Sequence, residues 1–193
     1  MIKIAITGNI ASGKSQVENI LTSLGFKVID SDKINNKLLT ENNDVISEIK
    51  SEFGDEIFES TGEISKPKLA EIVFNSQEKK MKLENILHKR ILEKINEFFD
   101  KYNNEKFVFA SVPLLFEVNW QNNFDKIIFV SSDEKTRLKR LILRNNLTEE
   151  QAKKRISAQR NEEEKIKQSD FTIYNNSDIT ALEKSVNEII KNI

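Results

Sequence analysis

The chain has 193 residues, which suits one α/β domain with insertions and is long enough to bury a core without disulfides. Its 30 basic and 31 acidic residues nearly cancel, so no global basic field favours nucleic acid or an anionic membrane as a partner. The absence of cysteine excludes disulfides and thiolate metal sites. No apolar run approaches the roughly 20 residues of a membrane span, and no signal-peptide pattern opens the chain, so we expect a cytoplasmic protein without a membrane segment.

A P-loop follows the first predicted strand, at residues 2–7. Gly8-Asn9-Ile10-Ala11-Ser12-Gly13-Lys14-Ser15 fits the pattern GxxxxGK(S/T) in full. In this motif backbone N–H groups surround phosphate oxygens, the lysine reaches the β- and γ-phosphates, and the hydroxyl after it can ligate Mg²⁺. Apolar residues then recur at helical spacing, and the positive end of the helix dipole favours an anion at the loop. The motif and its context together predict a site for nucleotide phosphates.

A second strand is predicted at residues 26–29 and runs into Asp30-Ser31-Asp32. Ligands of open α/β sheets bind at the carboxyl ends of strands, so these aspartates are placed to face the phosphates. One of them can act as a general base for an attacking hydroxyl, and the other can hold Mg²⁺ or its waters. The alternative is that Asp30 or Asp32 only caps a helix that begins near Lys33.

Residues 34 to about 104 are predicted to be mostly helical, because apolar residues recur there every three or four positions. Turns are expected at residues 61–63 and 65–67, and Pro67 suits the first turn of another helix. The stretch is too long for a simple crossover, so it predicts a helical insertion beside the sheet that binds a second substrate. His88 is the only histidine, and we interpret it as an exposed or half-buried helix residue, the most common situation for a histidine.

A near-continuous apolar strand is predicted at residues 106–112, as a sheet buried on both faces requires. P-loop enzymes keep a group that supports Mg²⁺ after such a strand, which makes Ser111 and Glu117 candidates; the alternative for Glu117 is the start of a helix. A fourth strand is predicted at residues 126–130, and residues 131–133 are typical of a cap for the next helix.

Two helices rich in arginine are expected next, the second opening at residues 148–150. The first carries Arg137, Lys139, Arg140 and Arg144, and the second carries Arg155 and Arg160. The pair suggests a lid, since arginines brought in by closure can stabilise the charge of phosphoryl transfer. For any single arginine the alternative is a solvated helix face, and we expect residues 161–165 to be solvated helix surface.

A last strand is predicted at residues 171–174 and a closing helix at residues 179–191. The loop between them begins at Asn175. Backbone amides in a loop near the P-loop can read an adenine base, so this loop is either an adenine-binding edge or an ordinary turn.

Five segments together resemble the dephospho-coenzyme A kinase family of P-loop kinases over essentially the full length. They are residues 7–15, 28–32, 112–117, 138–140 with Arg144, and 170–176. Pro113-Leu114-Leu115-Phe116-Glu117 and the aspartate pair are the most specific of them. The resemblance implies transfer of the ATP γ-phosphate to the ribose 3′-hydroxyl of dephospho-CoA with Mg²⁺, the last step of coenzyme A biosynthesis. It also implies that Asp32 is the base and that Arg140 contacts the ATP phosphates.

Three positions depart from the family pattern. Family members often carry His-Pro where this chain has His88-Lys89, many have aspartate at the place of Ser111, and threonine is common at the place of Gln16. None of these positions is Lys14, Ser15 or Asp32.

We therefore expect an α/β fold with a parallel-sheet P-loop kinase core and helices on both faces. The expected core is residues 1–33, 106–132 and 166–193, with a helical CoA-substrate domain at 34–105 and an arginine-bearing lid at 133–165. The expected catalytic residues are Asp32, Lys14 and Arg140. The expected nucleotide-binding residues are Gly8, Ala11, Ser12, Gly13, Lys14, Ser15, Gln16, Arg144 and Asn175. Ser15 and Asp30 are the expected Mg²⁺ ligands.

The expected partners are ATP and dephospho-CoA, bound by a monomer or weak homo-oligomer, without nucleic acid or membrane. The nearest alternative is another P-loop kinase that acts on a small metabolite or a nucleoside monophosphate. A nucleotide switch is a more distant alternative, because no Asn-Lys-x-Asp guanine-reading motif occurs in the chain.

Overall fold

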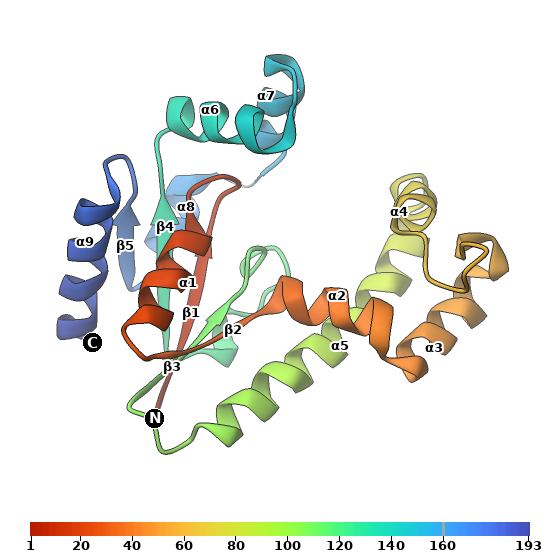
Figure 1. Cartoon of the computed structure of the whole chain (residues 1–193), viewed down its shortest axis with the longest axis horizontal. Coiled ribbons are helices and arrows are strands. Elements are labelled where there is room, and N and C mark those ends of the chain that lie inside the picture. The colour runs from red at the N-terminus through yellow and green to blue at the C-terminus, as the bar shows by residue number, and fades with distance from the viewer. Residues whose placement is uncertain (160) are drawn as a thin grey trace. The chain divides into compact units, whose positions relative to one another are not determined.

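The structure is a computed structural model that describes residues 1–159 and 161–193. Arg160 of the expected lid therefore lies outside the described residues. The chain divides into two compact units, one formed by Met1–Asp30 with Lys101–Ile193 and the other by Ser31–Asp100. In Figure 1 the first unit contains all the strands, and the second is helical.

A parallel sheet in the order β2-β3-β1-β4-β5 forms the centre of the first unit. Its strands are β1 (Ile2–Gly8), β2 (Lys27–Asp30), β3 (Phe107–Ser111), β4 (Lys126–Ser131) and β5 (Phe171–Tyr174). Each strand begins and ends within one residue of its predicted bounds. Because all the strands run the same way, their carboxyl ends meet at one edge, where the P-loop leaves β1.

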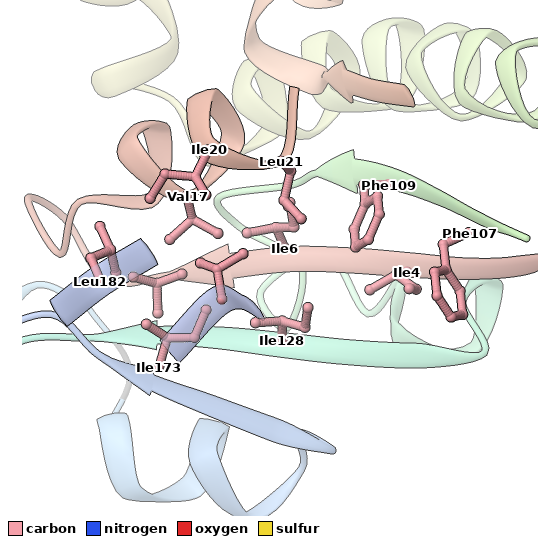
Figure 2. Close-up of a cluster of buried hydrophobic side chains, with 12 residues drawn as sticks. Ile4, Ile6, Val17, Ile20, Leu21, Phe107, Phe109, Ile128, Ile173 and Leu182 are labelled. Carbon is pink, nitrogen blue, oxygen red and sulfur yellow. The ribbon is translucent and has the colours of Figure 1, made fainter. Parts of the chain in front are cut away.

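Helices α1 (Lys14–Ser23) and α9 (Ile179–Asn192) contact each other and cover one face of the sheet. Figure 2 shows their apolar side chains, from Val17 to Leu182, packed on alternate residues of the strands such as Ile4 and Ile6. Helix α8 (Glu162–Lys167) packs against β4 and lies behind the sheet in Figure 1, away from α1. Helices on both faces confirm the α/β class expected from the apolar strands.

Helices α6 (Glu134–Asn145) and α7 (Glu149–Ser157) pack on each other at the carboxyl edge of the sheet. Asp133 caps α6 as predicted, accepting the Thr136 N–H at 2.8 Å. That bond, the Thr136 hydroxyl and the charge of Arg140 lower the pKa of the Asp133 carboxyl. The P-loop residues Ile10 and Ala11 pack against the small apolar core of these helices.

The second unit consists of helices, as predicted for residues 34–104. These are α2 (Ser31–Glu41), α3 (Asn43–Phe53), the short η1 (Asp55–Ile57), α4 (Lys66–Phe74) and α5 (Gln77–Lys101); the first unit adds η2 (Gln121–Asn123). Pro67 lies in the first turn of α4, as predicted. His88 is half-buried on α5, and this burial lowers its pKa against the opposing charge of Glu84. Among the described residues, no helix has the length and apolar character needed to cross a bilayer.

Candidate active site

The P-loop follows a tight path that leaves no room for a side chain at two of its glycines. A Cβ on Gly8 would lie 2.4 Å from the carbonyl oxygen of Val130 in β4. At Gly13, where φ is +96°, a Cβ would lie 2.0 Å from Nδ2 of Asn175. The ends of β4 and β5 therefore confine the loop, and its shape depends on glycine at both positions.

Asn175 and Arg140 hold the loop through its backbone. Asn175 Nδ2 donates to the carbonyl oxygen of Ser12 at 2.9 Å and to Oε1 of Gln16 at 3.2 Å. Arg140 donates to the carbonyl oxygens of Ser12 at 3.3 Å and Asn175 at 3.1 Å, and to the hydroxyl of Ser132 at 3.4 Å. The structure thus brings Ser12, Gln16, Arg140 and Asn175 together. Because these acceptors are uncharged, they leave the positive charge of Arg140 for an anion.

Lys14 forms a triangle of polar contacts with Glu18, one turn later in α1, and with Ser111 at the end of β3. Its Nζ is 2.8 Å from Oε1 of Glu18 and 2.5 Å from Oγ of Ser111. The Ser111 hydroxyl in turn donates to the same Glu18 oxygen at 2.5 Å. Glu18 was not a predicted site residue. Its position four residues after Lys14, on the same helix face, was the available signal.

The side chain of Ser12 carries an orphaned polar atom. Its Oγ is buried and makes no hydrogen bond within the part of the chain that the structure describes. A buried hydroxyl without a partner is costly, and a phosphate oxygen at the loop would satisfy it. The loop therefore fits an anionic ligand by its glycines, by this hydroxyl and by the positive end of the α1 dipole.

The expected Mg²⁺ ligands offer oxygen atoms only. Ser15 is exposed in the first turn of α1, and Asp30 ends β2 in register with Ser111. Hydroxyl and carboxylate oxygens are the donors that Mg²⁺ prefers. No group of three or more His, Cys, Asp or Glu able to hold a metal occurs in residues 1–159 or 161–193.

Asp32 lies in the first turn of α2, which begins at Ser31. The helix therefore starts before Lys33, the predicted beginning, and includes Asp32 among its first residues. Asp30 belongs to the unit with the sheet, and Asp32 belongs to the helical unit. The roles of the two aspartates stay predictions.

The prediction that residues 161–165 form solvated helix surface is wrong for Lys165. This side chain is 3% exposed; its Nζ lies 2.6 Å from Oε1 of Glu117 and donates to Oδ1 of Asn9 in the P-loop at 3.0 Å. Glu117 begins no helix, since residues 113–119 form turns, and its carboxylate pairs with this lysine. Lys165 is buried because its partners come from the loop after β3 and from the P-loop, neither of which is near α8 in sequence.

Glu162 departs from the solvated-surface prediction as well. Its carboxylate accepts the Asn9 amide at 2.9 Å, a short hydrogen bond from the hydroxyl of Ser131 and an ion pair from Arg137 at 3.3 Å. Arg137 is therefore buried at the base of α6. The side chain of Gln159 accepts the Ile10 N–H at 2.7 Å, so residues near α8 hold the P-loop at two points.

The arginines of the expected lid are not gathered at the loop. Arg140 contacts it, Arg137 faces Glu162, and Arg144 and Arg155 are exposed. The Arg144 Nε donates to the neighbouring Asn145 at 2.9 Å. The structure thus does not bring Arg144 to the other predicted nucleotide-binding residues.

Comparison with known proteins agrees with this architecture. The family model for dephospho-CoA kinase matches residues 2–181. A dephospho-CoA kinase of Fusobacterium nucleatum is 42% identical over 190 residues, covering 98% of this chain and 97% of the relative. One of Listeria monocytogenes is 38% identical over 192 residues, covering 97% of this chain and 95% of the relative. The solved dephospho-CoA kinase of Campylobacter jejuni is 35% identical, with a TM-score of 0.74 over 98% of this chain and 96% of its own.

These matches span the P-loop, the aspartate pair, the Pro113–Glu117 segment and Asn175, the positions on which the resemblance of the sequence rested. The chain belongs to the dephospho-CoA kinase family.

Proposed function

We propose that this protein transfers the γ-phosphate of ATP to the 3′-hydroxyl of the ribose of dephospho-CoA, giving coenzyme A and ADP. The observation that carries the proposal is the convergence of Lys14, Arg140 and Asn175 on a glycine-confined P-loop in a chain of this family. Phosphoryl transfer needs little covalent chemistry from the protein, so positioning and charge stabilisation account for most of the catalysis.

In this proposal the loop amides and Lys14 hold the β- and γ-phosphates. Arg140 adds positive charge where the transferred group develops charge on its equatorial oxygens. Asn175 keeps the loop in shape through Ser12 and Gln16. Arg140 and Asn175 are held against the loop by hydrogen bonds in the structure without nucleotide, so these two side chains need little reorganisation during the reaction.

Mg²⁺ is proposed as the metal, with Ser15 and Asp30 as its protein donors. When bound, the metal neutralises the charge that develops on the phosphate oxygens. Ser15 supplies a hydroxyl beside the phosphates, and Asp30 supplies a carboxylate at the end of β2.

Asp32 is proposed as the general base that accepts the proton of the 3′-hydroxyl. A carboxylate suits this role because the hydroxyl becomes acidic only as the new bond to phosphorus forms. Residues 34–105 are proposed to bind the CoA substrate, and residues 133–165 to act as a lid that closes over the nucleotide.

The proposal is tested by measuring ADP formation with ATP and Mg²⁺ in the presence of dephospho-CoA, AMP, shikimate or pantothenate. We expect rapid turnover with dephospho-CoA alone and a product heavier by one phosphoryl group. Lys14→Met is the matched inactive control, since it removes the phosphate-binding cation. Turnover on another of these acceptors would replace the substrate assignment, and nucleotide binding without turnover on any acceptor would favour a binding protein.

We further propose a cytoplasmic protein that binds only these small molecules and is a monomer or weak homo-oligomer. Light scattering at micromolar and higher concentrations, with and without ATP, tests the oligomeric state. A stable larger assembly at low concentration would contradict it.

A further inference from the structure

The P-loop helix carries a buried carboxylate that the proposed function leaves without a role. Glu18 is 7% exposed and lies next to Val17 on the buried side of α1. Glutamate is among the residues least often buried, because taking its charge out of water is costly unless a cation or donors replace the water. Its burial at this point therefore needs a partner, and the structure provides two.

Those partners are Lys14 and Ser111. The Lys14 ammonium lies 2.8 Å from Oε1 of Glu18, and the Ser111 hydroxyl donates to the same oxygen at 2.5 Å. The triangle as a whole is neutral. In the proposed function, however, Lys14 turns its charge to the β- and γ-phosphates. Glu18 then keeps only the bond from Ser111, and a buried carboxylate with one neutral donor is unfavourable.

The position of Glu18 indicates which cation can take the place of Lys14. Side chains on a helix lean toward its N-terminus, so the Glu18 carboxylate lies over the turn that contains Lys14 and Ser15. Ser111 lies at the carboxyl end of β3, in register with Asp30 of β2 and Ile6 of β1. The Glu18 carboxylate is therefore hydrogen-bonded to the strand neighbour of Asp30 and projects from the helix turn after Ser15, so it is near the elements that carry both expected Mg²⁺ donors. Mg²⁺ in proteins usually keeps several waters that donate to such groups.

We propose that Glu18 is a positioning residue that serves two cations in turn. It holds the Lys14 ammonium while the nucleotide site is empty, and it accepts hydrogen bonds from the water shell of Mg²⁺ once Lys14 engages the phosphates. Ser111 orients the carboxylate in both states. This deepens the proposed function and rests on it only in taking ATP with Mg²⁺ as the ligand.

Glu18 then has opposite effects on nucleotide binding without and with Mg²⁺. Without Mg²⁺, Glu18 competes with the phosphates for Lys14 and repels their charge, so it weakens binding. With Mg²⁺, the same carboxylate supports the metal and strengthens binding. Glu18 therefore increases the factor by which Mg²⁺ raises the affinity for ATP or ADP. The affinity for AMP, whose phosphate does not reach Lys14, does not depend on Glu18.

The test is calorimetric titration of the full chain with ATP, ADP and AMP, in EDTA and in Mg²⁺, for the wild type and Glu18→Gln. Glutamine keeps the shape and removes the charge. We expect the Mg²⁺ factor for ATP to fall about tenfold, the lower end of the effect of losing a group that supports a metal site. Glu183→Gln, the same change at an exposed position of α9, is the control and leaves the factor unchanged.

Two further variants keep the test decisive. Ser111→Ala is expected to lower the Mg²⁺ factor in the same direction, and Ser111→Asp added to Glu18→Gln is expected to restore it by returning a carboxylate to the triangle. An unchanged Mg²⁺ factor in Glu18→Gln, or an equal loss for all three nucleotides in both buffers, would overturn the proposal, since the latter indicates a purely structural role. Because no acceptor is present, failure to phosphorylate dephospho-CoA would refute the proposed function without affecting this result.

Discussion

Replacing Lys165 by methionine tests the buried contact between α8 and the P-loop. The substitution keeps most of the side-chain volume and leaves the carboxylate of Glu117 without its cation at 2.6 Å. Breaking a buried ion pair by removing one partner costs about 3–5 kcal/mol. Glu117 is 23% exposed and keeps some water, so we expect about 3 kcal/mol, including the lost bond to Asn9. For a chain of this size that lowers the unfolding midpoint by about 6–12 °C.

The assay is urea unfolding followed by the fluorescence of Trp120, the only tryptophan, which lies in the same unit as Lys165. Lys167→Met, an exposed position of α8, is the matched control and should change stability by less than about 0.5 kcal/mol. Adding Glu117→Gln removes the stranded charge, so the double variant should lose less than the sum of the single losses. A loss in Lys165→Met no larger than the control's, or strictly additive losses, would refute the reasoning.

Three other predictions concern Asp32, Gly13 and His88. Asp32→Asn should lower kcat by about 10²–10⁴ while the Kd for ATP stays unchanged; a near-normal rate would remove Asp32 from the role of base. Gly13→Ala should weaken ATP binding about tenfold or more, because its Cβ would meet Asn175 at 2.0 Å, whereas Gly25→Ala, with φ of +89° and nothing within 4 Å, should cost stability only. Equal ATP affinities of these two variants would contradict the clash. The single imidazole signal in NMR should titrate below the ordinary histidine pKa of about 6.5, because burial lowers the pKa of His88. The unfolded chain then takes up a proton on His88 at higher pH than the folded chain does. The stabilisation of the folded state by neutral His88 is therefore complete above about pH 6.5 and is lost as pH falls. This pH dependence of stability should be absent in His88→Gln.

Several features of this protein could be determined from the sequence because they depend on local chemistry. A phosphate site made of backbone N–H groups needs only glycines, a lysine and a helix start close together in the chain, and residues 8–15 contain all of them. The central strands β1, β3 and β4 could be placed within one residue because strands buried on both faces of a parallel sheet require near-continuous apolar runs. The cap at Asp133 and Pro67 in the first turn of α4 depend likewise on neighbours within a turn.

Only the tertiary structure decided where the charged side chains lie. Glu162 and Lys165 belong to a run of charges that predicts solvent exposure, yet they are held by Asn9, Arg137 and Glu117 from distant parts of the chain. Glu18 was not singled out from the sequence, and its hydrogen bond from Ser111 exists only because the fold places β3 beside α1. Whether a charge is buried depends on the partners that replace its water, and folding brings those partners together from positions that no local pattern connects.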